Sequence, residues 1–175
     1  KDYDVISFSS ITKGDYNAKM SLLSNDLNIE GVEQIFLSDS QDVVIFPRNR
    51  EITVRKNRDF EFSGKIVAGF FLFAGSSYSF NYDKFEIDMP NVDYIRMRVP
   101  SHELDRNGMP KYVFVKNRLE NVSGYLEIDK PNNKSGYKDS HEFPIFHSKE
   151  DCYVYYDGKK IQDAVYKRDN FYFQI

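Results

Sequence analysis

ITVRKNRDFEFSGKIVAGFFLFAGSSYSFNYDKFEIDMPNVDYIRMRV, residues Ile52 to Val99, carries the clearest structural pattern in the chain. It contains five triplets in which two apolar residues flank a third residue, and this middle residue is polar or charged in four of them. The triplets are 52–54, 60–62, 71–73, 78–80 and 85–87. Such alternation is typical of a strand with one buried face. The 15 Phe and 13 Tyr of the chain agree, because aromatic residues favour strands.

The spacing of these triplets predicts a solenoid. With the apolar pair 66–67 included, the segments begin at 52, 60, 66, 71, 78 and 85. Strands of a sandwich recur about every 8–12 residues, whereas three short strands per coil give a period of about 20 residues. Gly64, Gly69 and Gly75 supply corners. We therefore predict an all-β, right-handed parallel β-helix-like fold. An antiparallel sandwich or barrel is the alternative, with a hairpin turn at 74–77.

More short strands are predicted outside this segment. Upstream they lie at 20–23, 27–29, 34–37 and 43–46, and Asn25, Asp26, Asn28 and Gly31 disfavour a helix over 20–37. Downstream we predict a polar loop from Pro100 to Pro110, strands at 112–115 and 125–128, and a loop at 129–141. A hairpin follows at 152–161, turning at Asp157-Gly158, and the last strand lies near 170–175.

Length and charge set the organisation. We expect one domain, residues 1–175, with a solenoid part at 20–99 and a loop-rich capping part at 100–175. The first residue is not Met and the last residues are apolar, which suggests a fragment of a longer protein. A net charge of -3 gives no reason to expect nucleic acid as a partner. No apolar run approaches the roughly 18 residues of a membrane-spanning helix.

The sequence holds no complete catalytic or metal-binding motif. His102, His141 and His147 lack the spacing of a metal-binding helix or knuckle, so no metal and no cofactor are predicted. Cys152 follows the pattern of buried packing. Acidic residues that a sugar-cleaving enzyme would need are numerous, and nothing distinguishes a pair. No catalytic residue is assigned, and we lean towards a protein that is not an enzyme.

Two groups of residues are candidates for binding. The segment 48–58 holds five cations that would suit a polyanion, or that would serve only as a charged strand edge against unwanted pairing. They are Arg48, Arg50, Arg55, Lys56 and Arg58. Tyr153 and Tyr155 share one face of a strand. If this face is exposed, it can stack on sugar rings or contact a protein partner; if it is buried, it caps the solenoid.

Several phrases carry a resemblance. VVIFPRNRE at 43–51, FEFSGKIVAG at 60–69, IDKPNNKSG at 128–136 and YVYYD at 153–157 resemble a segment of very large, uncharacterised exported proteins of Bacteroidetes-type bacteria. The likeness covers most of the chain and contains no catalytic motif. It implies a location in the cell envelope or outside the cell, and it assigns no role to any residue.

Together these observations predict a non-catalytic structural or interaction module of a larger exported or cell-envelope protein. A polysaccharide or another envelope protein would be its partner. The alternative is a carbohydrate-binding or polysaccharide-cleaving domain that uses an acidic or aromatic surface of the same β scaffold. Fold alone does not decide between them, because function depends on the site.

Overall fold

The computed structural model describes residues 6–11, 14–38, 40–138, 140–155, 168 and 172–174. Over these residues the regular structure consists of strands and one short 3-10 helix, η1. In chain order the elements are β1 (Ser7–Ser10), β2 (Ala18–Met20), β3 (Leu27–Glu30), β4 (Val32–Ser38), β5 (Val43–Pro47), η1 (Arg48–Arg50), β6 (Glu51–Val54), β7 (Phe60–Ala68), β8 (Phe71–Asn81), β9 (Glu86–Leu104), β10 (Pro110–Phe114), β11 (Leu119–Glu120), β12 (Val122–Glu127), β13 (Ile145–Ser148), β14 (Tyr153–Tyr155) and β15 (Tyr172–Gln174).

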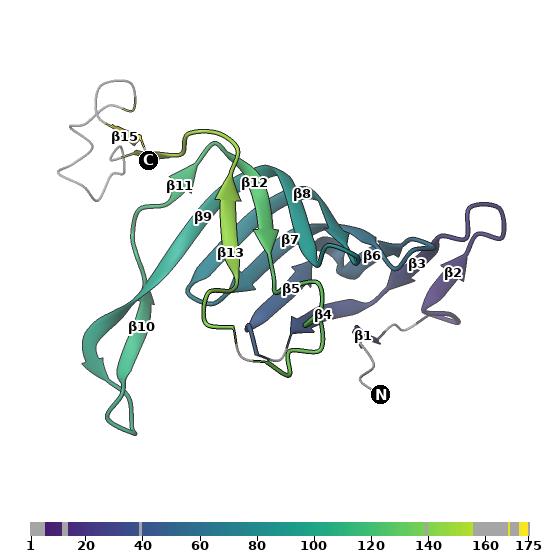
Figure 1. The fold of residues 1–175 in the computed structure, drawn as a ribbon, viewed down its shortest axis with the longest axis horizontal. Helices are drawn as coiled ribbons and strands as arrows, with labels where there is room; N and C mark the ends of the chain where they lie inside the picture. Colours follow the sequence, from purple (N-terminus) through teal and green to yellow (C-terminus); the bar gives the residue numbers. More distant parts are fainter. Residues whose placement is uncertain are drawn as a thin grey trace.

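Three long strands form the centre of the fold (Figure 1). Strands β7, β8 and β9 run antiparallel, and β5, β4 and β1 extend the sheet on the β7 side. On the other side, β9 pairs with β12 through its first half and with β10 through its second half. The short strands β6, β3 and β2 continue from the first residues of β7. The sheet is therefore built mainly from neighbours in sequence.

The predicted all-β class is confirmed, and the parallel β-helix is wrong. Every strand pair within the described residues is antiparallel, as in the sandwich-or-barrel alternative. The short segments that suggested coils are pieces of longer strands. Residues 60–62 and 66–67 both belong to β7, and 71–73 and 78–80 both belong to β8. The predicted turn at 74–77 lies inside β8, so it is wrong as well.

β-Bulges explain why long strands resemble short ones in sequence. In β8, Phe73, Tyr78 and Phe80 are all buried. Phe73 is separated from the other two by an odd number of positions, so regular alternation would place it on the opposite face of the sheet. The register shifts between β7 and β8 next to Gly64, and between β8 and β9 at Gly75. An extra residue in one strand moves the following side chains to the other face and bends the sheet. The glycines that we expected at solenoid corners thus lie at bulges or, for Gly69, in the turn before β8.

Gly64 is required by close backbone contact. Its φ is 148°, and a Cβ atom there would lie 2.2 Å from the carbonyl oxygen of Phe46. Residue 64 pairs with Pro47 in β5. Only a residue without a side chain lets these two strands pair at this point.

Most of the other predicted strands are confirmed. The structure has strands at 27–30, 32–38, 43–47, 110–114, 122–127, 153–155 and 172–174. The strand expected at 20–23 ends at Met20, and residues 22–24 form a turn. The polar loop expected from Pro100 to Pro110 is largely strand, because β9 continues to Leu104 and β10 begins at Pro110. The turn at Asp157-Gly158 lies outside the described residues.

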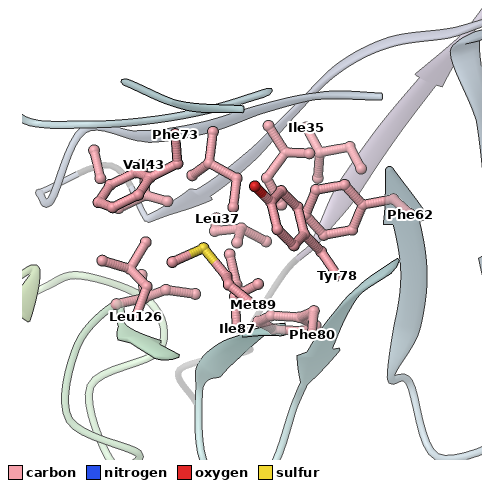
Figure 2. Close-up of a cluster of buried hydrophobic side chains, with 14 of the residues drawn as sticks. Ile35, Leu37, Val43, Phe62, Phe73, Tyr78, Phe80, Ile87, Met89 and Leu126 are labelled. Atoms are coloured by element: carbon pink, nitrogen blue, oxygen red, sulfur yellow. The ribbon is translucent and has the colours of Figure 1, made fainter. Parts of the chain in front are cut away.

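The hydrophobic core fills the space inside the bent sheet (Figure 2). Ile35, Ile45, Ile66, Phe73 and Ile95 occupy paired positions across five adjacent strands, and all five side chains are buried. Aromatic rings add specific contacts. The rings of Phe60 and Phe80 stack at 4.6 Å, and Phe73 contacts Phe146 of β13 at 5.1 Å. Side chains from β4 and β5 therefore meet side chains from β8, β9, β12 and β13, which closes the two parts of the sheet over one core.

The second half of β9 and strand β10 form a two-stranded ribbon, which extends away from the rest of the sheet (Figure 1). The ribbon spans the expected boundary near residue 99, since β9 runs through that position without interruption. Side chains from His102 to Val113 are exposed. A two-stranded ribbon is marginal by itself in water. Its contacts with the sheet at its base therefore matter for its stability.

Candidate functional site

The predicted basic segment 48–58 lies in η1, β6 and the turn before β7. Arg48 Nη2 lies 3.8 Å from Asp93 Oδ2 and donates a 3.3 Å hydrogen bond to the carbonyl oxygen of Gly75. Arg50 Nη2 lies 3.4 Å from Glu33 Oε1. Both arginines therefore have a carboxylate partner, which reduces the positive potential that they offer to an external polyanion.

The turn residues of this segment are also engaged. Arg55 donates to Asp26 Oδ2 at 2.6 Å and to both carboxylate oxygens of Glu61, at 2.9 and 3.0 Å. The hydrogen bond with Glu61, and the charges of Glu61 and Asp26, raise the pKa of Arg55. The guanidinium of Arg58 stacks over the ring of Tyr82, with 3.9 Å from its carbon to the ring centroid. Lys56 is exposed in the turn. Three of the five cations thus have carboxylate partners, and a polyanion site in this segment stays a prediction.

An open polar groove lies beside η1. It is lined by side chains of η1, β6, β7 and β8, among them Asn49, Thr53, Ser63 and Ser77. Its walls are already connected by internal contacts: the Ser77 backbone N–H donates to Ser63 Oγ at 3.1 Å, and Glu61 pairs with Arg55. The groove presents hydroxyl and amide groups, without a buried charged group that would fix a small ligand.

The tyrosines that we predicted do come together at the surface. The rings of Tyr153 and Tyr155 stack at 6.2 Å. Tyr172 of β15 joins them, 5.7 Å from Tyr153 and 6.2 Å from Tyr155. We call these three residues the tyrosine face. Tyr153 and Tyr155 are half-buried, and Tyr172 is 49% exposed. The face is therefore partly exposed, and its contact with sugar rings or with a protein partner stays a prediction.

Polar side chains surround the tyrosine face. Asn121 Nδ2 donates to the Tyr155 hydroxyl at 3.2 Å, and the guanidinium of Arg168 lies 4.1 Å from the centre of the Tyr155 ring. Arg168 also pairs with Glu120 at 2.8 Å. Aromatic rings beside amide, carboxylate and guanidinium groups are suited to stacking on a flat partner and to hydrogen bonding at its edges.

The remaining chemistry-bearing residues are separate from one another. His147 stacks on Tyr125 at 4.6 Å, with its Nε2 3.3 Å from Glu127 Oε1. Cys152 is buried, and its sulfur lies 3.3 Å from the Ser148 hydroxyl. Over the described part of the chain, no three His, Cys, Asp or Glu side chains are placed to hold a metal ion.

A buried polar network connects two segments that sequence reasoning did not relate. Gln41 Nε2 donates to Asp129 Oδ2 at 3.2 Å, and Asn133 Nδ2 donates to the same oxygen at 2.8 Å. Asp129 Oδ1 accepts the backbone N–H of Lys130 at 2.6 Å. Two side chains and one backbone N–H of the described residues thus donate to this buried carboxylate. The network therefore holds the loop after β12 against the turn between β4 and β5, and it is structural.

A second surface, also missed in the sequence, lies at the base of the β9–β10 ribbon. Tyr94, Arg96 and Arg98 alternate along β9, and Phe114 of β10 pairs with Arg98. The guanidinium carbon of Arg96 lies 4.2 Å from the centre of the Phe114 ring, and that of Arg98 lies 5.7 Å from it. Tyr112 stacks on Phe70 at 5.0 Å. We call this surface the arginine–aromatic strip; it consists of Phe70, Tyr94, Arg96, Arg98, Tyr112 and Phe114. The alternation of these residues at every second position was the signal that could have revealed it.

The described residues contain no helix with the length and apolar character needed to cross a membrane.

No family model, no curated protein and no solved structure matches the chain. A function is therefore proposed from the fold and its surfaces.

Proposed function

We propose that the chain is a non-catalytic interaction module of a larger exported or cell-envelope protein, and that the tyrosine face contacts its partner. The observation that carries this proposal is the grouping of Tyr153, Tyr155 and Tyr172 at the surface. Tyrosine is favoured in binding surfaces because its large rigid ring loses little conformational entropy on binding. The location in the envelope or outside the cell rests on the sequence resemblance alone.

Carbohydrate is the second candidate partner, and the polar groups around the tyrosine face favour it. Asn121 donates to the Tyr155 hydroxyl, Arg168 lies over the Tyr155 ring, and Glu120 pairs with Arg168. Sugars present both flat apolar faces and hydroxyl groups, so a ring with hydrogen-bonding neighbours fits them. Cleavage of a polysaccharide would require, in addition, two carboxyl groups about 5–10 Å apart across the bond.

Affinity gel electrophoresis through a panel of neutral polysaccharides tests these alternatives. The wild-type domain is compared with Tyr172→Ala, which removes the most exposed ring, and with Tyr137→Ala, which removes a tyrosine that is 76% exposed and distant in sequence. Retardation of the wild type that is lost only in Tyr172→Ala would favour carbohydrate. Reducing-sugar release in the same samples would contradict a non-catalytic role.

If neutral polysaccharides do not retard the domain, the protein partner is tested directly. Tyr172 is replaced by a photo-crosslinking phenylalanine analogue in the full-length protein, and crosslinked species are compared with those from the same substitution at Tyr137. A partner captured only from residue 172 supports the tyrosine face as the contact surface. Equal patterns from both positions would contradict it. Fractionation of the source cells, with an antibody against this chain, tests the envelope or extracellular location.

A further inference from the structure

We propose that the arginine–aromatic strip at the base of the β9–β10 ribbon binds an anionic polysaccharide. The site is separate from the tyrosine face and does not depend on the function proposed for it. Arg96 and Lys116 would provide the contacts with carboxylate or sulfate groups, and the exposed rings of Phe70 and Tyr112 would lie against sugar rings. Lys116 is exposed and follows Val115, whose backbone N–H donates to the carbonyl oxygen of Met97, the residue after Arg96.

Positive charge is concentrated in this part of the chain. Residues 94–118 hold six Lys and Arg against two Asp and Glu, whereas the rest of the chain holds 18 Lys and Arg against 25 Asp and Glu. The domain as a whole is acidic, so the ribbon is the region to which a negatively charged ligand would be directed. Opposite charge on a limited surface raises the rate and the specificity of encounter.

These cations, unlike those of segment 48–58, are mostly without carboxylate partners. Of the six, Lys111 pairs with Glu103 at 3.2 Å and Arg118 pairs with Glu120 at 2.9 Å. For the other four the described part of the structure shows no ion pair; they are Arg96, Arg98, Arg106 and Lys116. Their charge is therefore available to a ligand.

The stacking of Arg96 leaves its hydrogen-bond donors free. Its guanidinium lies over the Phe114 ring at 4.2 Å, and no hydrogen bond within the described residues uses it. A stacked guanidinium contacts the ring through its flat face, so its N–H groups, which lie in the plane, remain open for a two-pronged contact with a carboxylate or sulfate. Arg98 is less available, because its Nη2 donates to the carbonyl oxygen of Gly69 at 3.3 Å.

Exposed aromatic rings continue the same face. Phe70 is 53% exposed and Tyr112 is 51% exposed, and their rings stack on each other at 5.0 Å. Sugar rings pack on aromatic faces and edges of this kind. Cations and rings that alternate along an extended ribbon fit a linear chain of charged sugars better than a compact ion.

A nucleic acid is the less suitable polyanion. Its phosphates follow one another at about 3.4 Å along each strand, and such dense charge requires a broad basic surface. Here the strip is narrow, and the acidic remainder of the domain would repel a densely charged polymer. An acidic polysaccharide spaces its charges by whole sugar rings, which a few separated cations can match.

The test compares polygalacturonate with the same polymer after methyl esterification, which keeps the sugar and removes the charge. Binding is measured by affinity gel electrophoresis and by titration calorimetry, with dextran sulfate as a second anionic polymer. The variant Arg96→Gln with Lys116→Gln removes two cations of the ribbon. Its matched control, Arg50→Gln with Lys56→Gln, removes two cations of segment 48–58 and gives the same net charge.

We expect polygalacturonate or dextran sulfate to retard the wild-type domain in the gel, and the esterified polymer not to retard it. Affinity should fall about tenfold in the ribbon variant, as the loss of two charge-assisted contacts implies, and by less than about twofold in the control. Because Arg96 also packs on Phe114, the single variant Lys116→Gln, which changes one exposed side chain, is measured as well. It should weaken binding without changing the melting temperature.

Several results would overturn the proposal. Absence of binding to both anionic polymers would remove it. Loss of affinity in the control but not in the ribbon variant would transfer the site to segment 48–58. Tighter binding of a single-stranded oligonucleotide with the same number of charges would make the ligand a nucleic acid. Self-association of the wild type that the ribbon variant abolishes, without polymer binding, would make the ligand a second copy of the chain.

Discussion

Gly75 and Tyr78 are packed so closely that a Cβ atom at residue 75 would lie 2.4 Å from the Tyr78 hydroxyl oxygen. The same Cβ would lie 2.1 Å from the carbonyl oxygen of Asn91 in β9. Gly75 is at the register shift between β8 and β9, and Tyr78 is fully buried in the core. The bulge that bends the sheet and the ring that fills the bend therefore depend on each other.

Replacing Gly75 with Ala should destabilise the domain by about 2–4 kcal/mol, because a backbone oxygen and a buried ring must both move. Gly14→Ala is the matched control, since its Cβ would meet only one atom, at 3.9 Å. Urea unfolding of both variants measures the difference. Equal free energies of unfolding for the two variants would contradict the close packing at Gly75.

The hydroxyl of Tyr78 makes a second prediction possible. It is buried and has no hydrogen-bond partner within the described residues. Tyr78→Phe removes an unsatisfied polar group, so at pH 8 the variant should be as stable as the wild type or more stable by about 0.5–1 kcal/mol. Tyr137→Phe, at an exposed position, should have no effect. A loss above about 1 kcal/mol in Tyr78→Phe would show that the hydroxyl does have a partner.

The same residue gives a pH dependence. Burial, with a contribution from the charge of Asp93, raises the pKa of Tyr78 above its ordinary value of 10.0. The unfolded chain then releases this proton at a lower pH than the folded domain does, so the stability is present below about pH 10 and falls above it. In Tyr78→Phe the fall above pH 10 should be smaller by up to about 1.4 kcal/mol per pH unit. Urea unfolding at pH 8, 10 and 11 compares the two proteins; parallel losses would contradict the raised pKa.

The central strands show which parts of the fold can be predicted from the sequence. Alternation identifies Phe60-Glu61-Phe62 and Tyr78-Ser79-Phe80 as strand, because the pattern is local. It does not show that 60–62 and 66–67 form one strand, because Gly64, the buried position between them, has no apolar side chain. It does not join 71–73 to 78–80, because the bulge in β8 interrupts the alternation there. Strand direction depends on which segments pair, and pairing is set by packing between residues distant in sequence. The parallel β-helix therefore agreed with the spacing of the segments, but it is wrong.

Gly69 gives a fourth prediction, and it concerns the backbone alone. Its φ is 54° in the turn between β7 and β8, and a Cβ there would have no atom within 4 Å. Gly69→Val should cost more than about 1 kcal/mol through the left-handed conformation, because no clash contributes. Gly69→Asn should cost less, since Asn adopts this conformation more readily. Melting curves measure both; a Val variant as stable as the Asn variant would contradict the strain.

The buried network around Asp129 gives the fifth prediction. Asp129→Asn places an amide where the carboxylate accepts hydrogen bonds from Gln41 and Asn133, so a donor is left without an acceptor. We expect a loss of about 2–3 kcal/mol in the free energy of unfolding. Glu103→Gln, on the exposed ribbon, should change it by less than about 0.5 kcal/mol. Urea unfolding distinguishes the two, and equal stability of both variants would show that the network contributes little.

The binding surfaces were harder to predict than the strands. Tyr153 and Tyr155 were expected on one face, since they are two residues apart, but nothing local placed Tyr172 beside them. The five cations of segment 48–58 looked like one patch in sequence. Three of them, Arg48, Arg50 and Arg55, have carboxylate partners in β9, in β4 and in the residue before β3, so this neutralisation is visible only in the fold. Arg96 and Phe114 are likewise joined by strand pairing.

The contact between Gln41 and Asp129 also bears on the order in which the domain is made. The two residues are separated by 88 positions, so Gln41 leaves the ribosome well before its partner exists. At about 5–20 residues per second, the delay is roughly 4–18 s. During that time the core around Ile35, Leu37 and Ile45 lacks Leu126 of β12. Until the loop after β12 has been synthesised, the incomplete domain exposes apolar side chains, which favours aggregation.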